Sequence, residues 1–368
     1  MTGNVLENSN LLQQYDDKVR LYQSFANEVE HLIRSILNAS NINCNAISSR
    51  IKTRDSIAEK IRRKGGKYST ISDITDVVGV RIITYYSDDV DKVAKIIESE
   101  FDVDKENSID KRATLEPDRF GYCSVHYVVM MSPTRLALRE NRAFEGIKFE
   151  IQIRSVLQHA WAEIEHDIGY KSEVTIPPEM RRSFSRIAGL LEIADKEFNQ
   201  IRQDLVIYKQ SVQTQIAKDI ILDHDLDGVI LEVLVNSNPE VQELGQHISN
   251  LLKRTLSNDD SDDHLRSTIK CLNWLGIKTV RQLNTAISKY SKNAKVIASE
   301  LLKDYHDDST ASIGNTISLF YLSYAILLSD FGTKEQIYRY FKDNSIGLDE
   351  ETKKLTKKFL NIKTNLNI

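Results

Sequence analysis

Residues Ile147–Arg154 read IKFEIQIR, and this stretch decides the fold class. Its apolar and polar residues alternate, and successive side chains of a strand point to opposite faces of a sheet. The sequence therefore predicts a strand with one buried apolar face and one polar face. The polar face carries two cations, an anion and an amide, from Lys148, Glu150, Gln152 and Arg154. On this pattern alone, a solvent-facing sheet surface is the simpler interpretation.

The rest of the first 210 residues predicts helices around a small sheet. Apolar periodicity predicts helices over residues 11–37, 50–64, 90–99, 155–168 and 179–209. Runs of β-branched and aromatic residues predict strands over 77–86 and 122–131, and polar residues predict a loop over 38–48. Ser155 is expected to cap the helix that follows it, and Gly169 to end that helix.

Composition limits the class of protein. The 368 residues are 41% hydrophobic and 28% charged, with 14 glycines and 5 prolines, which is typical of a globular protein rich in helices. The length favours two domains. The sequence shows neither a membrane-length apolar run nor a signal pattern, and its three cysteines form no CxxC pair, so a reducing cytoplasm is expected. The net charge of −4 means that any electrostatic site must be local.

A strongly basic segment, Arg50–Lys67, has eight basic and two acidic residues. As a helix beginning at Arg50, it would place Ser56, Lys60 and Arg63 on one face. Lysine and arginine side chains suit phosphate groups. A solvated helix face is the plainer alternative.

Two further groups of polar residues flank or lie in the predicted strands. Asp76 precedes the 77–86 strand and Arg81 lies within it; an acid at such an edge, beside phosphates, is a suitable Mg²⁺ ligand. By itself, Asp76 is more often a turn or capping acid. Tyr122, Ser124 and His126 would share one face of the 122–131 strand, where a tyrosine can stack on a planar base.

The helix over 155–168 carries His159, Glu163 and His166 at a spacing that can bind zinc. Their order differs from HExxH, and the helix shows ordinary core periodicity. A zinc site is therefore not expected.

Together these stretches resemble the synthetase domain of the RelA/SpoT family, the enzymes that make guanosine tetra- and pentaphosphate. Four motifs in the family's order carry the resemblance over about 125 residues. They are SRIKTRDSIAEKIRRK (Ser49–Lys64), DITDVVGVRIITYY (Asp73–Tyr86), DRFGYCSVHYVV (Asp118–Val129) and FEIQIRSVLQHAWAEIEHDIGYKSE (Phe149–Glu173).

The resemblance implies transfer of the β,γ-pyrophosphate of ATP to the 3′-hydroxyl of GDP or GTP, with Mg²⁺ as cofactor. It implies that Asp76 is a metal ligand and that Glu150 is the second catalytic carboxylate, which ligates metal or activates the hydroxyl. The residues implied for ATP binding are Arg50, Lys52, Ser56, Lys60 and Arg81. Those implied for the acceptor are Tyr122, which would stack on guanine, with His126, Arg119, Gln152, Arg154, His159, Glu163 and Lys171.

The guanine loop departs from the family pattern. Many members have a lysine three residues before the glycine of this loop, where this chain has Asp118 followed by Arg119. Arg119, Lys111 or Arg112 can supply the missing charge. The altered loop puts the GDP or GTP preference in doubt, and it leaves open a toxin-like relative that pyrophosphorylates the 3′ end of tRNA. A catalytically dead nucleotide sensor is a third, less favoured alternative.

The resemblance sets the expected domain organisation. We expect an α+β chain: a helical lead over residues 1–48, a nucleotidyltransferase-like synthetase domain with a small mixed β-sheet flanked by helices over 49–210, and an all-helical domain over 215–368. The lead is too short for the hydrolase domain of long family members. The last domain matches no regulatory module, and its role, like self-association of the chain, stays open. Tyr321 and Tyr324 form a YxxY pair that would either plug a nucleotide pocket or pack in a core.

Overall fold

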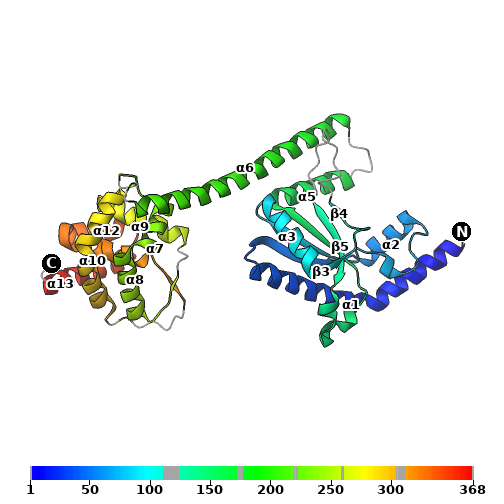
Figure 1. Ribbon diagram of the computed structural model, residues 1–368, viewed down its shortest axis with the longest axis horizontal. Helices are drawn as coiled ribbons and strands as arrows, with labels where there is room; N and C mark the ends of the chain where they lie inside the picture. The colour runs from blue at the N-terminus through cyan, green and yellow to red at the C-terminus, as the bar shows by residue number, and fades with distance from the viewer. Residues whose placement is uncertain are drawn as a thin grey trace. The chain divides into compact units, whose positions relative to one another are not determined.

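The computed structural model describes residues 2–110, 124–171, 177–218, 220, 223–257, 261–303, 305 and 311–366. The chain divides into two compact units, Met1–Gln203 and Asp204–Ile368 (Figure 1). The first unit contains the predicted sheet, and the second is helical apart from two very short strands.

The amino-terminal unit alternates helices and strands in an irregular order. Its strands are β1 (Cys44–Ile51), β2 (Val78–Thr84), β3 (Phe101–Val103), β4 (Ile109–Asp110), β5 (Val125–Met131) and β6 (Phe149–Ser155). Its α-helices are α1 (Thr2–Ala39), α2 (Arg54–Lys64), α3 (Ser87–Glu100), α4 (Pro133–Leu136), α5 (Val156–Lys171) and the part of α6 (Pro178–Ala217) that ends at Gln203. Two 3₁₀ turns, η1 (Ile71–Asp73) and η2 (Arg139–Phe144), complete it.

The strands form one mixed sheet. Its order is β1-β2-β6-β5-β3, with β4 also paired to β5. Strands β2 and β6 are parallel, whereas the other pairs are antiparallel. Helices α1, α3 and α5 lie against this sheet (Figure 1). The expected α+β architecture, a small mixed sheet flanked by helices, is confirmed.

The two faces of the sheet differ as the alternation in IKFEIQIR predicts. Phe149, Ile151 and Ile153 are fully buried, while the residues between them are partly exposed. Phe149 packs edge-on against Phe25 of α1, with ring centroids 5.2 Å apart, and buried residues of α3 join the same core. Because α1 and α3 cover the apolar face, the polar side chains of β6 are left on the opposite face.

Residues 44–51 are a strand, so the predicted loop over 38–48 and the helical start at Arg50 are wrong. Strand β1 lies at the edge of the sheet, and Ile47 is its only buried residue, so its apolar alternation is too weak to mark a strand. Thr53 caps the following helix, which therefore begins at Arg54. As a result Arg50 projects from a strand and does not share a helix face with Ser56.

One helix end and two short strands also differ from expectation. Helix α5 continues to Lys171 and is not ended by Gly169, which has lower helix propensity but is tolerated inside a helix. Strands β3 and β4 have three and two residues, too few for a periodic signal. Ser155 does cap α5, because its Oγ accepts a hydrogen bond from the backbone N–H of Gln158 at 3.1 Å.

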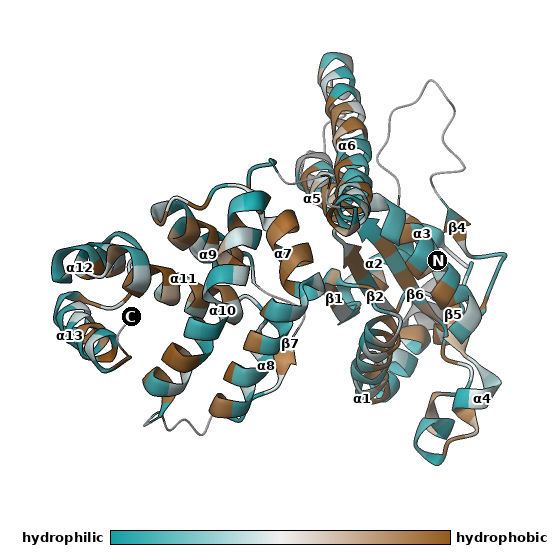
Figure 2. Ribbon diagram, turned by 60° about the vertical axis from the view of Figure 1, so that its left-hand side comes forward, coloured by the Kyte–Doolittle hydropathy of each residue, from teal (hydrophilic) through white to brown (hydrophobic). Residues whose placement is uncertain are grey.

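The carboxy-terminal unit is a bundle of helices. These are the end of α6, α7 (Gly228–Ser237), α8 (Pro239–Leu252), α9 (Asp262–Trp274), α10 (Val280–Leu302), α11 (Ile317–Ile326), the π-helical turn η3 (Leu327–Phe331), α12 (Lys334–Asp343) and α13 (Asp349–Leu366). Two parallel two-residue strands, β7 (Leu256–Ser257) and β8 (Ile313–Gly314), are small departures from the all-helical expectation. Helix α7 is hydrophobic over most of its length (Figure 2) and five of its residues are buried.

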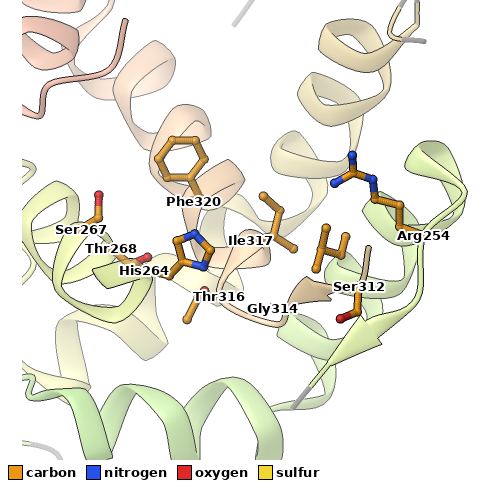
Figure 3. A pocket seen from close by; sticks show the side chains of 10 residues that line it. Arg254, His264, Ser267, Thr268, Ser312, Gly314, Thr316, Ile317 and Phe320 are labelled. Carbon is orange, nitrogen blue, oxygen red and sulfur yellow. The ribbon is translucent and has the colours of Figure 1, made fainter. Parts of the chain in front are cut away.

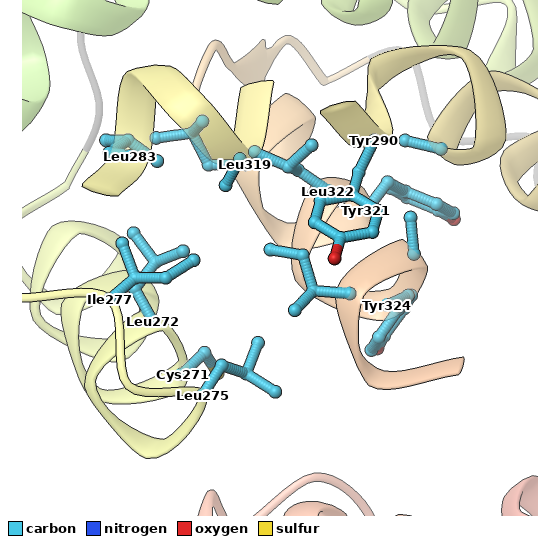
Figure 4. Close-up of a cluster of buried hydrophobic side chains, with 14 of the residues drawn as sticks. Cys271, Leu272, Leu275, Ile277, Leu283, Tyr290, Leu319, Tyr321, Leu322 and Tyr324 are labelled. Carbon is cyan, nitrogen blue, oxygen red and sulfur yellow. The ribbon is translucent and has the colours of Figure 1, made fainter. Parts of the chain in front are cut away.

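The YxxY pair lies in the core of this bundle (Figure 4). Tyr321 and Tyr324 are each only 8% exposed. Tyr324 packs edge-on against Phe359 with centroids 4.8 Å apart, and burial raises its pKa well above the ordinary value. Core packing therefore accounts for both rings, and they are not available to plug a nucleotide pocket.

Candidate active site

The polar face of the sheet carries side chains from four strands. Register places Arg50 opposite Gly79 and Gly79 beside Glu150. One step further along, Arg81 lies beside Gln152, which in turn lies opposite His126. Strand pairing thus brings residues of all four sequence motifs onto one surface. A small hollow opens there, lined by Ser48, Arg50, Gly79, Val80, Arg81 and Gln152.

Asp76 forms ion pairs with two lysines at one end of this face. Lys52 Nζ lies 2.6 Å from Asp76 Oδ2, and Lys60 Nζ lies 2.7 Å from Oδ1. Lys52 follows β1 and Lys60 projects from α2, whose buried Ile57 and Ile61 fix that helix against the core. Burial alone would raise the pKa of the Asp76 carboxyl, but the two ammonium groups outweigh it and hold this pKa below its usual value. The carboxylate is therefore ionised at neutral pH.

Glu150 is the centre of a hydrogen-bonded row along β5 and β6. Its Oε1 lies 2.9 Å from His126 Nδ1, and its Oε2 accepts a hydrogen bond from Gln152 Nε2 at 2.8 Å. His126 Nε2 lies 2.6 Å from Ser124 Oγ, and Arg154 donates to Gln152 Oε1 at 3.2 Å. Burial would raise the Glu150 pKa, but the bonds from His126 and Gln152 outweigh it, so the pKa is lowered.

The two carboxylates are close enough to influence each other. The negative charge of Asp76 is one of the effects that raise the Glu150 pKa, although the net shift of that pKa is downward. Both acids stay ionised because the cations and donors around them compensate for burial and for mutual repulsion. The face therefore holds two fixed negative charges among several cations, an arrangement suited to binding phosphates together with a divalent cation.

Helix α5 brings further side chains to the same face. Arg81 Nη1 lies 3.0 Å from Glu163 Oε1, and His159 Nδ1 lies 3.7 Å from the same oxygen. Burial lowers the pKa of His159 most, and the positive charge of nearby Arg81 lowers it further. Burial and Arg81 also lower the pKa of Arg154. His159, Glu163 and His166 do not form a group that could hold a metal ion. The described residues contain no other group of three or more histidine, cysteine, aspartate or glutamate side chains that could do so.

Most of the predicted site residues thus lie on one surface. Ser56 is exposed on the first turn of α2, with its Oγ 2.9 Å from Thr53 Oγ1. Tyr122 and Arg119 fall among residues 111–123, outside the described residues, as do Lys111, Arg112 and Asp118. The backbone of Lys171 ends α5, but its side chain is outside the description.

Three residues of this surface were missed as site candidates. Ser124 is 6% exposed and hydrogen-bonds His126, while Ser48 and Gly79 line the hollow. Alternation along the 122–131 strand already placed Ser124 beside His126, which was a usable signal. Ser48 and Gly79 had none, because their position depends on the pairing of β1 with β2.

Helix α6 contacts the start of α5 through Asp195. This carboxylate is 4% exposed and accepts a hydrogen bond at 2.7 Å from Ser155 Oγ, the same hydroxyl that caps α5. Further along α6, Arg202 pairs with Asp89 of α3 at 2.8 Å. Asp195 therefore orients the start of the helix that carries His159 and Glu163.

Replacing Asp195 tests this support. We expect Asp195→Ala to destabilise the amino-terminal unit by about 1–3 kcal/mol, because the buried Ser155 hydroxyl loses its acceptor. Asp195→Asn retains an oxygen acceptor and should restore most of this loss. Hydrogen exchange of the backbone over residues 155–163 measures the effect, and equal exchange in the wild type and Asp195→Ala would contradict it.

Comparison with known proteins identifies the family of the chain. A profile described as "Region found in RelA / SpoT proteins" matches residues 49–175. GTP pyrophosphokinase YwaC of Bacillus subtilis is 31% identical over 160 residues, which are 43% of this chain and 73% of YwaC. The chain belongs to the RelA/SpoT family. A second RelA/SpoT relative, GTP pyrophosphokinase YjbM of Bacillus subtilis, is 30% identical over 43% of this chain and 72% of its own.

Solved structures similar to this RelA/SpoT chain include small alarmone synthetase 1 from Bacillus subtilis bound to its product pppGpp. That match has 26% identity and a TM-score of 0.45, and covers 52% of this chain and 98% of the synthetase. The same synthetase bound to AMPCPP matches at 24% identity with a TM-score of 0.42, over 52% of this chain and 97% of that one. Among the described helices of this RelA/SpoT chain, none combines the length and the hydropathy that a membrane span requires.

Proposed function

We propose that the amino-terminal unit transfers the β,γ-pyrophosphate of ATP to the 3′-hydroxyl of GDP or GTP, giving AMP and a guanosine tetra- or pentaphosphate. The observation that carries this proposal is the convergence of Lys52, Lys60 and Asp76 with the Ser124–His126–Glu150 row on one face of the sheet. Family membership and the names of the relatives support the same activity.

On the donor side, the basic residues bind ATP. The ammonium groups of Lys52 and Lys60 both contact the Asp76 carboxylate. When ATP is bound, these two ammonium groups supply positive point charges to its phosphates. Arg50 is exposed and lies across from Gly79, where an added Cβ would be at an ordinary van der Waals distance of 3.9 Å from the arginine side chain. We assign Arg50 to adenine stacking, and Arg81 and Ser56 to the phosphate side.

On the acceptor side, Glu150 receives the proton of the 3′-hydroxyl. Its ionised carboxylate is hydrogen-bonded by His126 and Gln152, which orient it. His126 and Arg154 bind the acceptor phosphates in this proposal, and Tyr122 stacks on guanine. Pyrophosphoryl transfer depends mainly on positioning and on charge neutralisation, so these residue types are sufficient.

Mg²⁺ fits the donor set of this face. Asp76 and Glu150 offer ionised oxygen ligands, and Mg²⁺ in phosphoryl-transfer sites commonly takes one or two carboxylates and completes its shell with phosphate oxygens and water. When bound, the metal would neutralise charge on the transferred group. Asp76 and Glu150 are the residues that would hold it.

Incubating the full-length protein with Mg²⁺ and γ-labelled ATP tests the proposal, with GDP, GTP and bulk tRNA offered in parallel. Label on the guanosine nucleotide, with release of AMP, is expected. Label on tRNA alone would show that tRNA, and not a guanosine nucleotide, is the acceptor, and would favour the toxin-like alternative. Neither label nor AMP with any acceptor would contradict the proposed reaction.

The pH dependence follows from the two lowered carboxyl pKa values. Glu150 and Asp76 are ionised above their ordinary pKa values and lose their charge only as pH falls below them. We therefore expect these acids to cause no loss of kcat/KM between pH 8 and about pH 5. A pH profile with Glu145→Gln as a surface control checks this. A fall of kcat/KM below about pH 6–7 that is caused by protonation of Glu150 would show that the pKa of Glu150 is raised instead.

A further inference from the structure

The two units carry different kinds of candidate site. The carboxy-terminal unit has a pocket of about 410 Å³ whose lining includes Arg254, His264 and Phe320 (Figure 3). All residues assigned to the proposed reaction precede Asp204, where this unit begins. On the polar face of the sheet, a buried hydroxyl to which the proposed reaction gives no role, that of Ser124, contacts one of the assigned residues.

The backbone of β5 holds Ser124 next to His126. Val125, between them, is fully buried and pairs with Asp110 of β4 on one side and with Ile153 of β6 on the other. Successive side chains of a strand point to opposite faces, so burial of Val125 places Ser124 and His126 together on the polar face. Ser124 is 6% exposed, and its Oγ lies 2.6 Å from His126 Nε2.

The hydrogen bonds of the His126 ring determine where its hydrogens lie. Nδ1 is 2.9 Å from Glu150 Oε1, and an ionised carboxylate only accepts hydrogen bonds, so Nδ1 carries a hydrogen and donates it. Nε2 faces Ser124, whose hydroxyl can donate to an unprotonated Nε2 or accept from a protonated one. Both ring nitrogens are therefore engaged in either charge state of the imidazole.

These two hydrogen bonds select one of the two orientations of the imidazole ring. Rotation of the ring by half a turn about the Cβ–Cγ bond would exchange Nδ1 with Cδ2 and Nε2 with Cε1. Carbon atoms would then face Glu150 and Ser124, and both hydrogen bonds would be lost. Without the Ser124 hydroxyl, only the bond to Glu150 opposes this rotation, so the ring would be less well fixed.

We propose that Ser124 is a positioning residue for the acceptor nucleotide, because its hydroxyl fixes the His126 ring with Nδ1 on the Glu150 carboxylate and Nε2 toward the acceptor phosphates. This role rests on the proposed function, in which Glu150 receives the proton of the 3′-hydroxyl and His126 contacts those phosphates. Ser124 acts through His126 and does not touch the substrate. The ATP side is independent of Ser124, since Lys52 and Lys60 pair with Asp76 instead.

Steady-state kinetics of the full-length protein test this role with Ser124→Ala. The KM for GDP or GTP is expected to rise about tenfold, the effect of one lost buried hydrogen bond, while the KM for ATP stays within about twofold of the wild type. Ser124→Thr keeps a hydroxyl on the same Cβ and should restore most of the loss. Ser99→Ala is the matched control, because Ser99 is exposed and its hydroxyl donates to Ile96 O of its own helix. An equal rise of both KM values that Ser124→Thr does not reverse would indicate a purely structural role and overturn the proposal.

The ¹⁵N resonances of the His126 ring provide a measurement that is independent of the proposed reaction. In protein labelled on histidine, these resonances are identified by their absence from His126→Gln. We expect the Nε2 resonance to shift in Ser124→Ala, because Nε2 loses its hydrogen bond, and to return in Ser124→Thr. If the wild type transfers no pyrophosphate, the proposed function fails, whereas this shift still shows that Ser124 orients the ring. An unchanged Nε2 resonance in Ser124→Ala would overturn the positioning role whatever the activity.

Discussion

Glu150→Gln is expected to lower kcat for pyrophosphate transfer by about 10²–10⁴-fold, the usual contribution of a general base. The amide keeps the size of the side chain but removes its negative charge. It can no longer accept the proton of the 3′-hydroxyl or compensate the positive charge around it. Because Glu150 also anchors His126 at 2.9 Å, a modest rise of KM for the acceptor is expected as well.

Single-turnover formation of AMP measures this effect, and equilibrium binding of a non-hydrolysable ATP analogue serves as the control. We expect binding of the analogue to stay within a few-fold of the wild type, since the lysines of the donor side do not contact Glu150. Glu145→Gln is the matched variant, because Glu145 is exposed and precedes the same strand. Retention of most of the activity in Glu150→Gln would remove Glu150 from the proposed mechanism.

Asp76→Asn is expected to lower kcat/KM by about 10²–10³-fold and to raise the Mg²⁺ concentration needed for half-maximal activity. Two effects combine here. The metal loses a charged ligand, and Lys52 and Lys60, whose side chains are 24% and 18% exposed, lose the carboxylate between them. Repulsion between the two ammonium groups then displaces the residues assigned to the ATP phosphates.

A Mg²⁺ titration of activity separates this effect from simple destabilisation. The expected loss of stability is about 1 kcal/mol, since the three charged groups are partly hydrated. Asp73→Asn is the matched control: Asp73 is an exposed acid three residues earlier that caps a turn through the N–H groups of Ser69 and Thr70. An unchanged Mg²⁺ requirement in Asp76→Asn would contradict its assignment as a metal ligand.

The polar face was predictable to the extent that it depends on local alternation. The pattern around Phe149 and Ile151 correctly separated a buried face from one bearing Glu150, Gln152 and Arg154, because side chains of a strand alternate whatever its neighbours are. The same argument failed for residues 44–51. An edge strand with one buried residue has little periodicity, and its conformation comes from pairing with β2.

The relations between motifs were not readable from any one segment. Asp76 lies 24 residues from Lys52 and contacts both it and Lys60, and Glu150 is 24 residues from its partner His126. The contact between His126 and Glu150 requires a particular register of β5 and β6. Register is a property of paired strands, and a shift of either strand by one residue would turn its side chains to the opposite face. The contacts of Asp76 depend on how the start of α2 and the segment before β2 are placed beside each other.

By itself, the sequence determined the α+β class, the family resemblance, and which residue types are available for phosphate chemistry, since these follow from composition, periodicity and motif order. The tertiary structure decided that Asp76 joins two lysines, that Ser124 extends the His126–Glu150 pair, and that Asp195 supports the cap of α5. It also placed Tyr321 and Tyr324 in a core and opened a pocket beside Arg254. The physical reason is that burial and hydrogen bonding between distant residues depend on how the elements pack, and a linear pattern carries only the local part of that information.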